Sequence, residues 1–131
     1  MNVLGISEGF HDAGICLLRN DQIHFASHSE RHSRKKGDKW IHPNQLPKTH
    51  LIKPEIVAYY EKPFRKNLRR LYAGQRWQKP RNKYDVCFGH HESHAAAGYY
   101  TAPFDECNVL VIDAIGEWDT MSIWKGSVEN G

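Results

Sequence analysis

Residues 89–95 carry the densest group of side chains that could do chemistry. They read GHHESHA, with His90 and His94 four positions apart. On a helix such side chains lie on one face, one turn from each other, so the two imidazoles could share a metal ion. The spacing differs from the zinc-protease motif HExxH, because Ala95 stands three positions after Glu92. The pair is therefore compatible with a metal site and equally with a structural or surface role.

Asp113 offers a third ligand. It follows the apolar run at residues 109–112, where a buried carboxylate would be costly without a partner. The alternative is that Asp113 only caps the turn at residues 114–116. Two histidines and one carboxylate, with coordination positions left open, suit iron(II) or zinc. A soft-metal site is less suitable, because the nearest cysteine, Cys87, belongs to the preceding strand.

A second group lies in the glycine-bearing turn at residues 5–14. Its backbone N–H groups could face a phosphate or an anionic substrate, and His11 and Asp12 could position a proton or a substrate hydroxyl. The alternative is a hairpin turn that simply requires glycine. Five further histidines are expected to be structural or exposed, namely His24, His28, His32, His42 and His50.

Residues 62–83 contain nine Lys or Arg and no acid, half of the 18 basic residues of the chain. Tyr72 and Trp77 lie among them, and a basic stretch with aromatics is typical of nucleic-acid binding. The alternative is a solvated helix face plus a loop, or a basic wall that meets phosphate-bearing small molecules or another domain. We expect this alternative rather than RNA or DNA as a partner.

Elements that could position these groups follow from the apolar pattern. Three short strands are predicted over residues 2–6, 14–19 and 22–28, joined as an antiparallel meander. Residues 29–54 lose the alternation and predict a loop with at most one helical turn.

Strands and helices alternate in the rest of the chain. Strands are predicted over residues 55–61, 85–88, 108–113 and 120–125, the third with the composition of a buried strand. Helices are predicted from Pro63 to near Gly74 and over residues 90–100. Antiparallel strands followed by strand–helix units favour an α/β fold, a mixed sheet with helices on its faces.

The composition excludes several classes of protein. A chain of 131 residues, 40% apolar and 25% charged, is a globular domain rather than a disordered segment. The longest aliphatic run has four residues, which is too short for a membrane span, and the first 20 residues lack a signal-peptide pattern. Three widely spaced cysteines are expected to be reduced thiols of a cytoplasmic protein.

Four ordered motifs resemble those of one family. They are LGIS with FHDA at residues 4–13, SERHSRKKGD at 29–38, YEKPF at 60–64, and HHESHA at 90–95 with DAIGEW at 113–118. Together they are similar to the amino-terminal region of the O-carbamoyltransferases, which include nodulation and antibiotic-tailoring enzymes. The likeness runs in order over essentially the whole chain, which makes it far more specific than any single motif.

The resemblance implies the first lobe of an actin-like, sugar-kinase-like (ribonuclease H-like) fold over residues 1–131, close to the domain that threonylcarbamoylates tRNA adenosine. It implies transfer of a carbamoyl group from carbamoyl-adenylate to the hydroxyl of a small-molecule acceptor. A separate carboxyl-terminal domain would make that adenylate from ATP and carbamoyl phosphate.

The resemblance also implies roles for individual residues. His90, His94 and Asp113 would hold a divalent metal, iron or alternatively zinc, and a further aspartate ligand would lie beyond residue 131. His11 and Asp12 would face the active site as catalytic residues, with His11 as the candidate general base.

The chain departs from the family pattern at two places. His32 replaces a phenylalanine or leucine, and Ala114 with Ile115 replaces a Gly-Val pair. The second change makes the nucleotide-facing turn less permissive, and no cofactor-binding residues are assigned.

Two expectations concern the whole chain. Asn130 and Gly131 form a hairpin signal with no strand after it, so we expect a fragment that is incomplete at its carboxyl end and inactive alone. The alternative functions are a non-catalytic basic module that binds RNA or a phosphate-bearing ligand, and a metal-binding remnant without activity.

Overall fold

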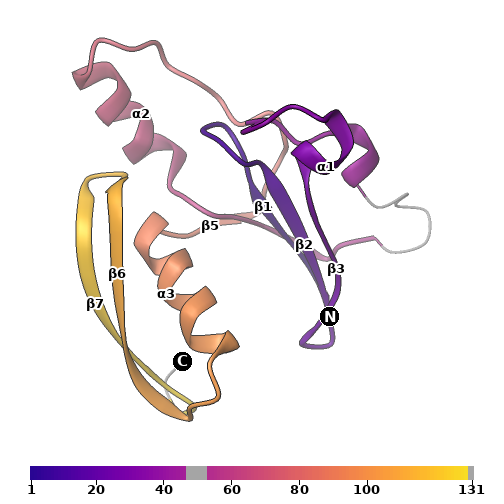
Figure 1. Cartoon of the computed structure of the whole chain (residues 1–131), viewed down its shortest axis with the longest axis vertical. Helices are drawn as coiled ribbons and strands as arrows, with labels where there is room; N and C mark the ends of the chain where they lie inside the picture. The colour runs from indigo at the N-terminus through magenta and orange to yellow at the C-terminus, as the bar shows by residue number, and fades with distance from the viewer. Residues whose placement is uncertain (47–52, 130–131) are drawn as a thin grey trace. The chain divides into compact units, whose positions relative to one another are not determined.

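A computed structural model describes residues 1–46 and 53–129 of the chain (Figure 1). The chain divides into two compact units. Unit 1 comprises Met1–Tyr60 and Gln78–Cys87, and unit 2 comprises Glu61–Trp77 and Phe88–Gly131. The expectations for His50 and for the hairpin signal at Asn130 lie outside the described residues.

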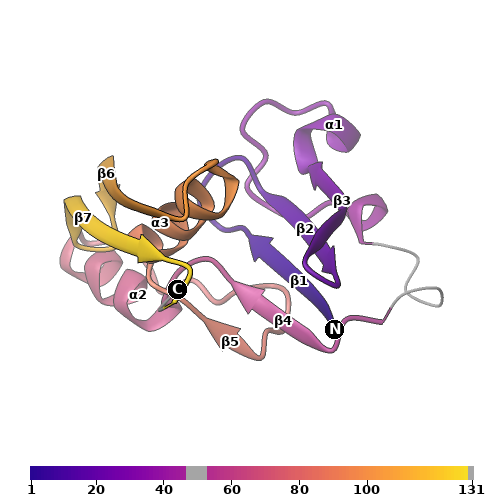
Figure 2. The same ribbon diagram turned by 90° about the horizontal axis from the view of Figure 1, so that it is seen from below.

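Unit 1 is built on a five-stranded sheet with the strand order β3-β2-β1-β4-β5 (Figure 2). The strands β1 (Asn2–Ser7), β2 (Gly14–Arg19) and β3 (Gln22–His28) form the predicted antiparallel meander. The strand β4 (Ile56–Tyr59) pairs parallel with β1, and β5 (Val86–Cys87) pairs parallel with β4. The prediction of an α/β fold with a mixed sheet is confirmed.

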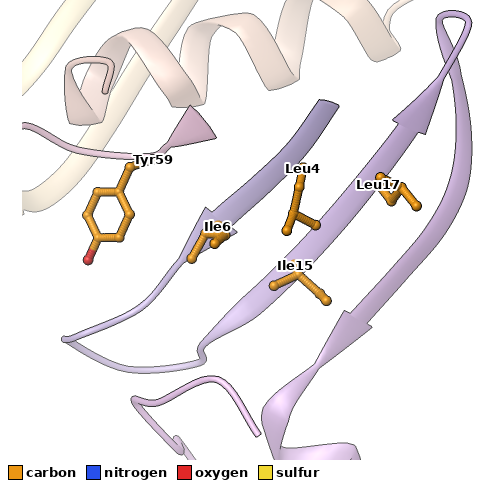
Figure 3. Close-up of a cluster of buried hydrophobic side chains, with 5 residues drawn as sticks. All are labelled: Leu4, Ile6, Ile15, Leu17 and Tyr59. Atoms are coloured by element: carbon orange, nitrogen blue, oxygen red, sulfur yellow. The ribbon is translucent and has the colours of Figure 1, made fainter. Parts of the chain in front are cut away.

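The core of unit 1 lies on one face of this sheet. Its buried side chains are Leu4, Ile6, Ile15, Leu17 and Tyr59 (Figure 3). The first four alternate along β1 and β2, because successive strand residues point to opposite faces and every second side chain packs on the same side, and Tyr59 comes from β4. This packing holds the β1–β2 turn, which carries His11 and Asp12, at one end of the sheet.

The segment after β3 contains two short helical elements, so the prediction of at most one helical turn was wrong. They are α1 (Ser29–Ser33) and the 3₁₀ turn η1 (Pro43–Gln45). Ser29 and Gln45 are fully buried and joined by a side-chain hydrogen bond, while the His42 N–H donates to Gln45 Oε1 at 2.9 Å. Polar contacts of this kind leave no periodic trace in a sequence.

Unit 2 contains two helices and one strand pair. The helices are α2 (Pro63–Tyr72) and α3 (His90–Thr101), and the strands β6 (Glu106–Gly116) and β7 (Asp119–Ser127) form an antiparallel hairpin. The helix α3 lies against this hairpin (Figure 1). A Cβ added to Gly126 of β7 would stand 2.5 Å from the Tyr99 ring, so the helix and hairpin approach as closely as a glycine permits.

One expectation about burial in unit 2 was wrong. The strand β6 is not buried on both faces, because Val111 is buried while Leu110 and Ile112 are 56% and 72% exposed. In α2 the buried residues are the polar Lys66 and Asn67 rather than its apolar members. An apolar composition therefore does not mark the covered face of either element.

No helix in the described ranges is long and apolar enough to cross a membrane.

Candidate metal centre

The first turn of α3 positions two of the candidate ligands. Gly89 precedes the helix, and its N–H donates to Glu92 Oε2 at 2.8 Å, so the Glu92 side chain caps the N-terminus of the helix. The helix then begins at His90, and His94 follows one turn later on the same face. The Nε2 atoms of these two imidazoles are 3.1 Å apart.

The β6 strand supplies the third candidate ligand. Asp113 Oδ2 lies 2.7 Å from His90 Nε2 and 3.8 Å from His94 Nε2. The three residues each offer one ligand atom, and these atoms all lie within 4.8 Å of one another. The His90 side chain is 14% exposed, that of Asp113 is 30% exposed, and that of His94 is 56% exposed, so the group opens to solvent on the His94 side.

A register shift between Ile112 and Gly116 brings Asp113 to this place, inside β6 rather than at its end. The Ala114 N–H donates to Asp113 Oδ1 at 2.6 Å, so this carboxylate also caps its own backbone. The two interpretations of Asp113 are therefore compatible, because one oxygen serves the turn while the other faces the histidines.

The pKa values of the paired groups shift downward in both partners. Burial lowers the pKa of His90 below its usual 6.5, although the hydrogen bond with Asp113 opposes this shift. Burial would raise the pKa of Asp113, but hydrogen bonds from His90 and from the Ala114 N–H outweigh it, and this pKa lies below 3.8. A neutral imidazole therefore faces an ionised carboxylate, as metal binding requires.

Gly116 sets how closely the histidine rings can approach β6. A Cβ at this position would stand 2.4 Å from a ring carbon of His90 and 2.6 Å from one of His91. His91 is buried, and its Nδ1 lies 2.7 Å from Ser122 Oγ of β7. His91 thus ties α3 to the hairpin, a structural role that the sequence analysis did not assign.

A buried ion pair that was not predicted from the sequence lies beside His90. Glu61 and Lys66 are 3% and 6% exposed, and Lys66 Nζ lies 2.5 Å from Glu61 Oε1. The other oxygen, Glu61 Oε2, lies 4.0 Å from His90 Nδ1. Because 29 positions separate Glu61 from His90, spacing alone gives no signal of this contact.

The donor set fits a divalent transition metal. Two imidazole nitrogens and a carboxylate oxygen face one another, and three protein ligands leave coordination positions open for a substrate atom. Iron(II) and zinc both accept such ligands.

The predicted catalytic residues His11 and Asp12 belong to unit 1. His11 Nδ1 lies 2.7 Å from Asp12 Oδ2, and the two side chains are 63% and 42% exposed. Asp12 has a φ of +50°, in the left-handed region that non-glycine residues rarely adopt. The turn therefore presents a paired imidazole and carboxylate near its tip.

Unit 1 brings together a second group that the sequence analysis did not predict. Asp12, His28 and Glu30 each offer one ligand atom within 4.8 Å of the others. The β2–β3 pairing of Gly14 with His28 creates this proximity between segments 16 positions apart. Glu30 Oε2 accepts a hydrogen bond from the Gly37 N–H at 3.2 Å. His28 is exposed, as expected from the sequence.

The basic stretch at residues 62–83 is divided between the units, and several of its members make internal contacts. Lys66 pairs with Glu61, and Arg70 Nε donates to the Arg76 carbonyl at 3.1 Å. In unit 1 the Arg81 guanidinium stacks 3.9 Å from the centre of the Trp40 ring. These positive groups are therefore partly engaged within the fold, which weighs against a continuous nucleic-acid surface.

Comparison with known proteins gives a family match over residues 44–130, described as "Carbamoyltransferase N-terminus". This range contains all three candidate metal ligands. His11 and Asp12 lie before it.

Two curated relatives are uncharacterized proteins. One, from Synechocystis sp., is 29% identical over 95% of this chain and 27% of its own length. The other, from Methanocaldococcus jannaschii, is 30% identical over 88% of this chain and 22% of its own length. The chain thus spans about a quarter of the length of these relatives, 27% and 22%.

Proposed function

The chain belongs to the family of carbamoyltransferase amino-terminal domains, and from this premise we propose that it supplies a metal-dependent site for carbamoyl transfer to a substrate hydroxyl. The convergence of His90 Nε2, His94 Nε2 and Asp113 Oδ2 carries the proposal. A neutral imidazole and an ionised carboxylate are already in the protonation states of metal ligands.

His90, His94 and Asp113 would hold the metal, iron or alternatively zinc. When bound, such an ion supplies Lewis acidity toward the carbamoyl carbonyl. The exposed side of the group, at His94, leaves room for a substrate to approach. Gly116 has no side chain, so the His90 ring can lie against bare backbone.

The donor in this proposal is carbamoyl-adenylate, formed from ATP and carbamoyl phosphate. The acceptor oxygen bonds to the carbamoyl carbon, the bond from that carbon to the phosphate oxygen breaks, and AMP leaves. His11 would take the acceptor's hydroxyl proton as general base. Asp12, 2.7 Å from His11 Nδ1, would hold the ring so that Nε2 receives this proton.

The proposal extends to the architecture of the whole protein. Residues 1–131 would be the amino-terminal lobe of an actin-like domain, with a second lobe and an adenylate-forming domain as partners. The mixed sheet and the family match support this assignment.

The three cysteines are free thiols, which supports a cytoplasmic protein without structural disulfides.

A transfer assay tests the proposed function. The chain, together with the proposed adenylate-forming domain, would be supplied with ATP, labelled carbamoyl phosphate and hydroxyl acceptors. We expect His90→Ala to lower the rate by about 100-fold or more, because loss of a metal ligand removes several kcal/mol of transition-state stabilisation. His24→Ala, an exposed site in β3, is the matched control. Equal rates in the two variants would contradict the proposal.

A further inference from the structure

We propose that Glu61 is a positioning residue of the metal centre, whose carboxylate favours the His90 tautomer and ring orientation that present Nε2 to a divalent cation. This inference rests on the proposed function, because it concerns the same ligand.

The two nitrogens of His90 face different carboxylates. Nε2 lies 2.7 Å from Asp113 Oδ2 and 3.1 Å from His94 Nε2, so it belongs to the ligand group. Nδ1 lies 4.0 Å from Glu61 Oε2. This separation is longer than a hydrogen bond, so the contact is electrostatic in this structure. Each carboxylate therefore acts on one nitrogen of the ring.

A bound cation fixes which nitrogen of His90 carries the ring proton. In the cation-free protein, His90 Nε2 lies at hydrogen-bond distance, 2.7 Å, from Asp113 Oδ2. A cation needs the Nε2 lone pair, and the proton of a neutral ring must then sit on Nδ1. Nδ1 is the nitrogen that faces Glu61, and a carboxylate beside this N–H stabilises the metal-binding tautomer.

Lys66 makes a buried carboxylate tolerable at this position. Glu61 is almost fully buried, and an isolated charge there would be costly. Lys66 Nζ pairs with Oε1 at 2.5 Å and leaves Oε2 directed to the His90 side. The two carboxylate oxygens of Asp113 are used in a similar way. Oδ1 accepts a hydrogen bond from the Ala114 N–H, and Oδ2 faces His90 Nε2.

The competing explanation is a purely structural Glu61–Lys66 ion pair. Removing Glu61 alone would take away the carboxylate that pairs with the buried Lys66, and this would destabilise the fold for reasons unrelated to the metal. A matched pair of variants avoids this problem. Lys66→Gln keeps a donor for Glu61, and the double variant Glu61→Gln with Lys66→Gln differs from it only by replacing the carboxylate with an amide.

The experiment is a Zn²⁺ competition titration of the chain and both variants, with urea unfolding of each metal-free protein. We expect the double variant to bind Zn²⁺ about 10- to 100-fold more weakly than Lys66→Gln, the range found when a carboxylate behind a histidine ligand is removed. We also expect the Nδ1–H proton of His90 in the Zn²⁺-loaded protein to move upfield in the NMR spectrum of the double variant.

The outcomes separate this inference from the proposed function. Equal Zn²⁺ affinities in the two variants, with wild-type binding intact, would overturn the role of Glu61 alone. Absence of Zn²⁺ binding by the wild-type chain would overturn the metal site and this inference together. A loss of urea stability without a loss of Zn²⁺ affinity would show that Glu61 is only structural.

Discussion

His90 faces two carboxylates of unit 2, one on each nitrogen of its ring. Its ring lies between Asp113 and Glu61, and burial holds it neutral. A neutral histidine next to an ionised aspartate favours cation binding, because no imidazolium has to be deprotonated first.

The lowered pKa of His90 predicts how stability changes with pH. The unfolded chain, with a histidine pKa near 6.5, takes up this proton before the folded protein does. The contribution of His90 to the free energy of unfolding is therefore fully present above about pH 6.5. It is lost as the pH drops from 6.5 toward the lower folded-state pKa of His90. We expect metal-free wild-type protein to lose stability between about pH 7 and pH 5, and His90→Gln to lose less.

Urea unfolding at several pH values measures this effect. Asp113 acts in the same direction at lower pH, because its folded-state pKa lies below the ordinary 3.8. Its contribution to stability is lost only as the pH falls below 3.8 toward this lower pKa. The His24→Gln variant controls for removal of a histidine. The interpretation of His90 would be contradicted if its removal left the slope between about pH 7 and pH 5 unchanged.

At the scale of elements, the β6–β7 hairpin determines whether the three candidate ligands lie close together. Its register shift brings Asp113 to α3, and the absence of a side chain at Gly116 admits the His90 and His91 rings. The candidate site therefore depends on the contact between α3 and the hairpin, and we expect a substitution on the hairpin to affect the candidate ligands of α3.

Gly116→Ala tests this dependence. Its Cβ would stand 2.4 Å from the His90 ring, so the ring must shift, and we expect weaker Zn²⁺ binding and a loss of about 1–3 kcal/mol in stability from overpacking. Gly5→Ala in β1 is the control, because its Cβ would meet only Cys16 O at 3.6 Å. Thermal unfolding and Zn²⁺ titration measure both effects. Unchanged Zn²⁺ affinity in Gly116→Ala would disprove the coupling.

The helix α2 gives a prediction about nucleic acid. Because Lys66 and Arg70 make internal contacts, we expect no tRNA binding that falls steeply with salt. Filter binding at low and high salt, with the double variant Arg69→Gln and Arg70→Gln as comparison, measures this. A salt-steep affinity that weakens in the variant would support the basic binding module instead.

Local sequence patterns predicted most elements of the fold. Apolar runs predicted β1 and β2, alternation predicted β3, and Pro63 predicted the start of α2. Helical spacing singled out His90 and His94, and an apolar run pointed to Asp113. These features depend on near neighbours in the chain, which a sequence displays directly.

The parts that were missed depend on contacts between distant segments. Glu61 and Gly116 meet His90 from 29 and 26 positions away, and nothing periodic connects them. The apolar run of β6 suggested burial on both faces, whereas α3 covers a single face and leaves Ile112 exposed. The composition of a strand shows how hydrophobic its side chains are, but the element that packs against the strand determines which of them are buried.

At the scale of the whole molecule, the chain spans 27% and 22% of the length of two relatives. Formation of carbamoyl-adenylate and the second lobe belong, in our proposal, to sequence other than residues 1–131. We therefore predict that these residues alone form no carbamoylated product from ATP and carbamoyl phosphate. Product formation by residues 1–131 in a labelled assay would contradict this assignment.

Metal analysis of the purified chain tests the central claim most directly. Iron or zinc content would be measured after reconstitution and dialysis in wild type, His90→Ala, His94→Ala and His28→Ala. The last is a matched control, because His28 belongs to the other group of potential ligands. We predict about one ion per chain in wild type and in His28→Ala, and loss of the ion in the other two variants. Unchanged metal content in His90→Ala and His94→Ala would contradict the account.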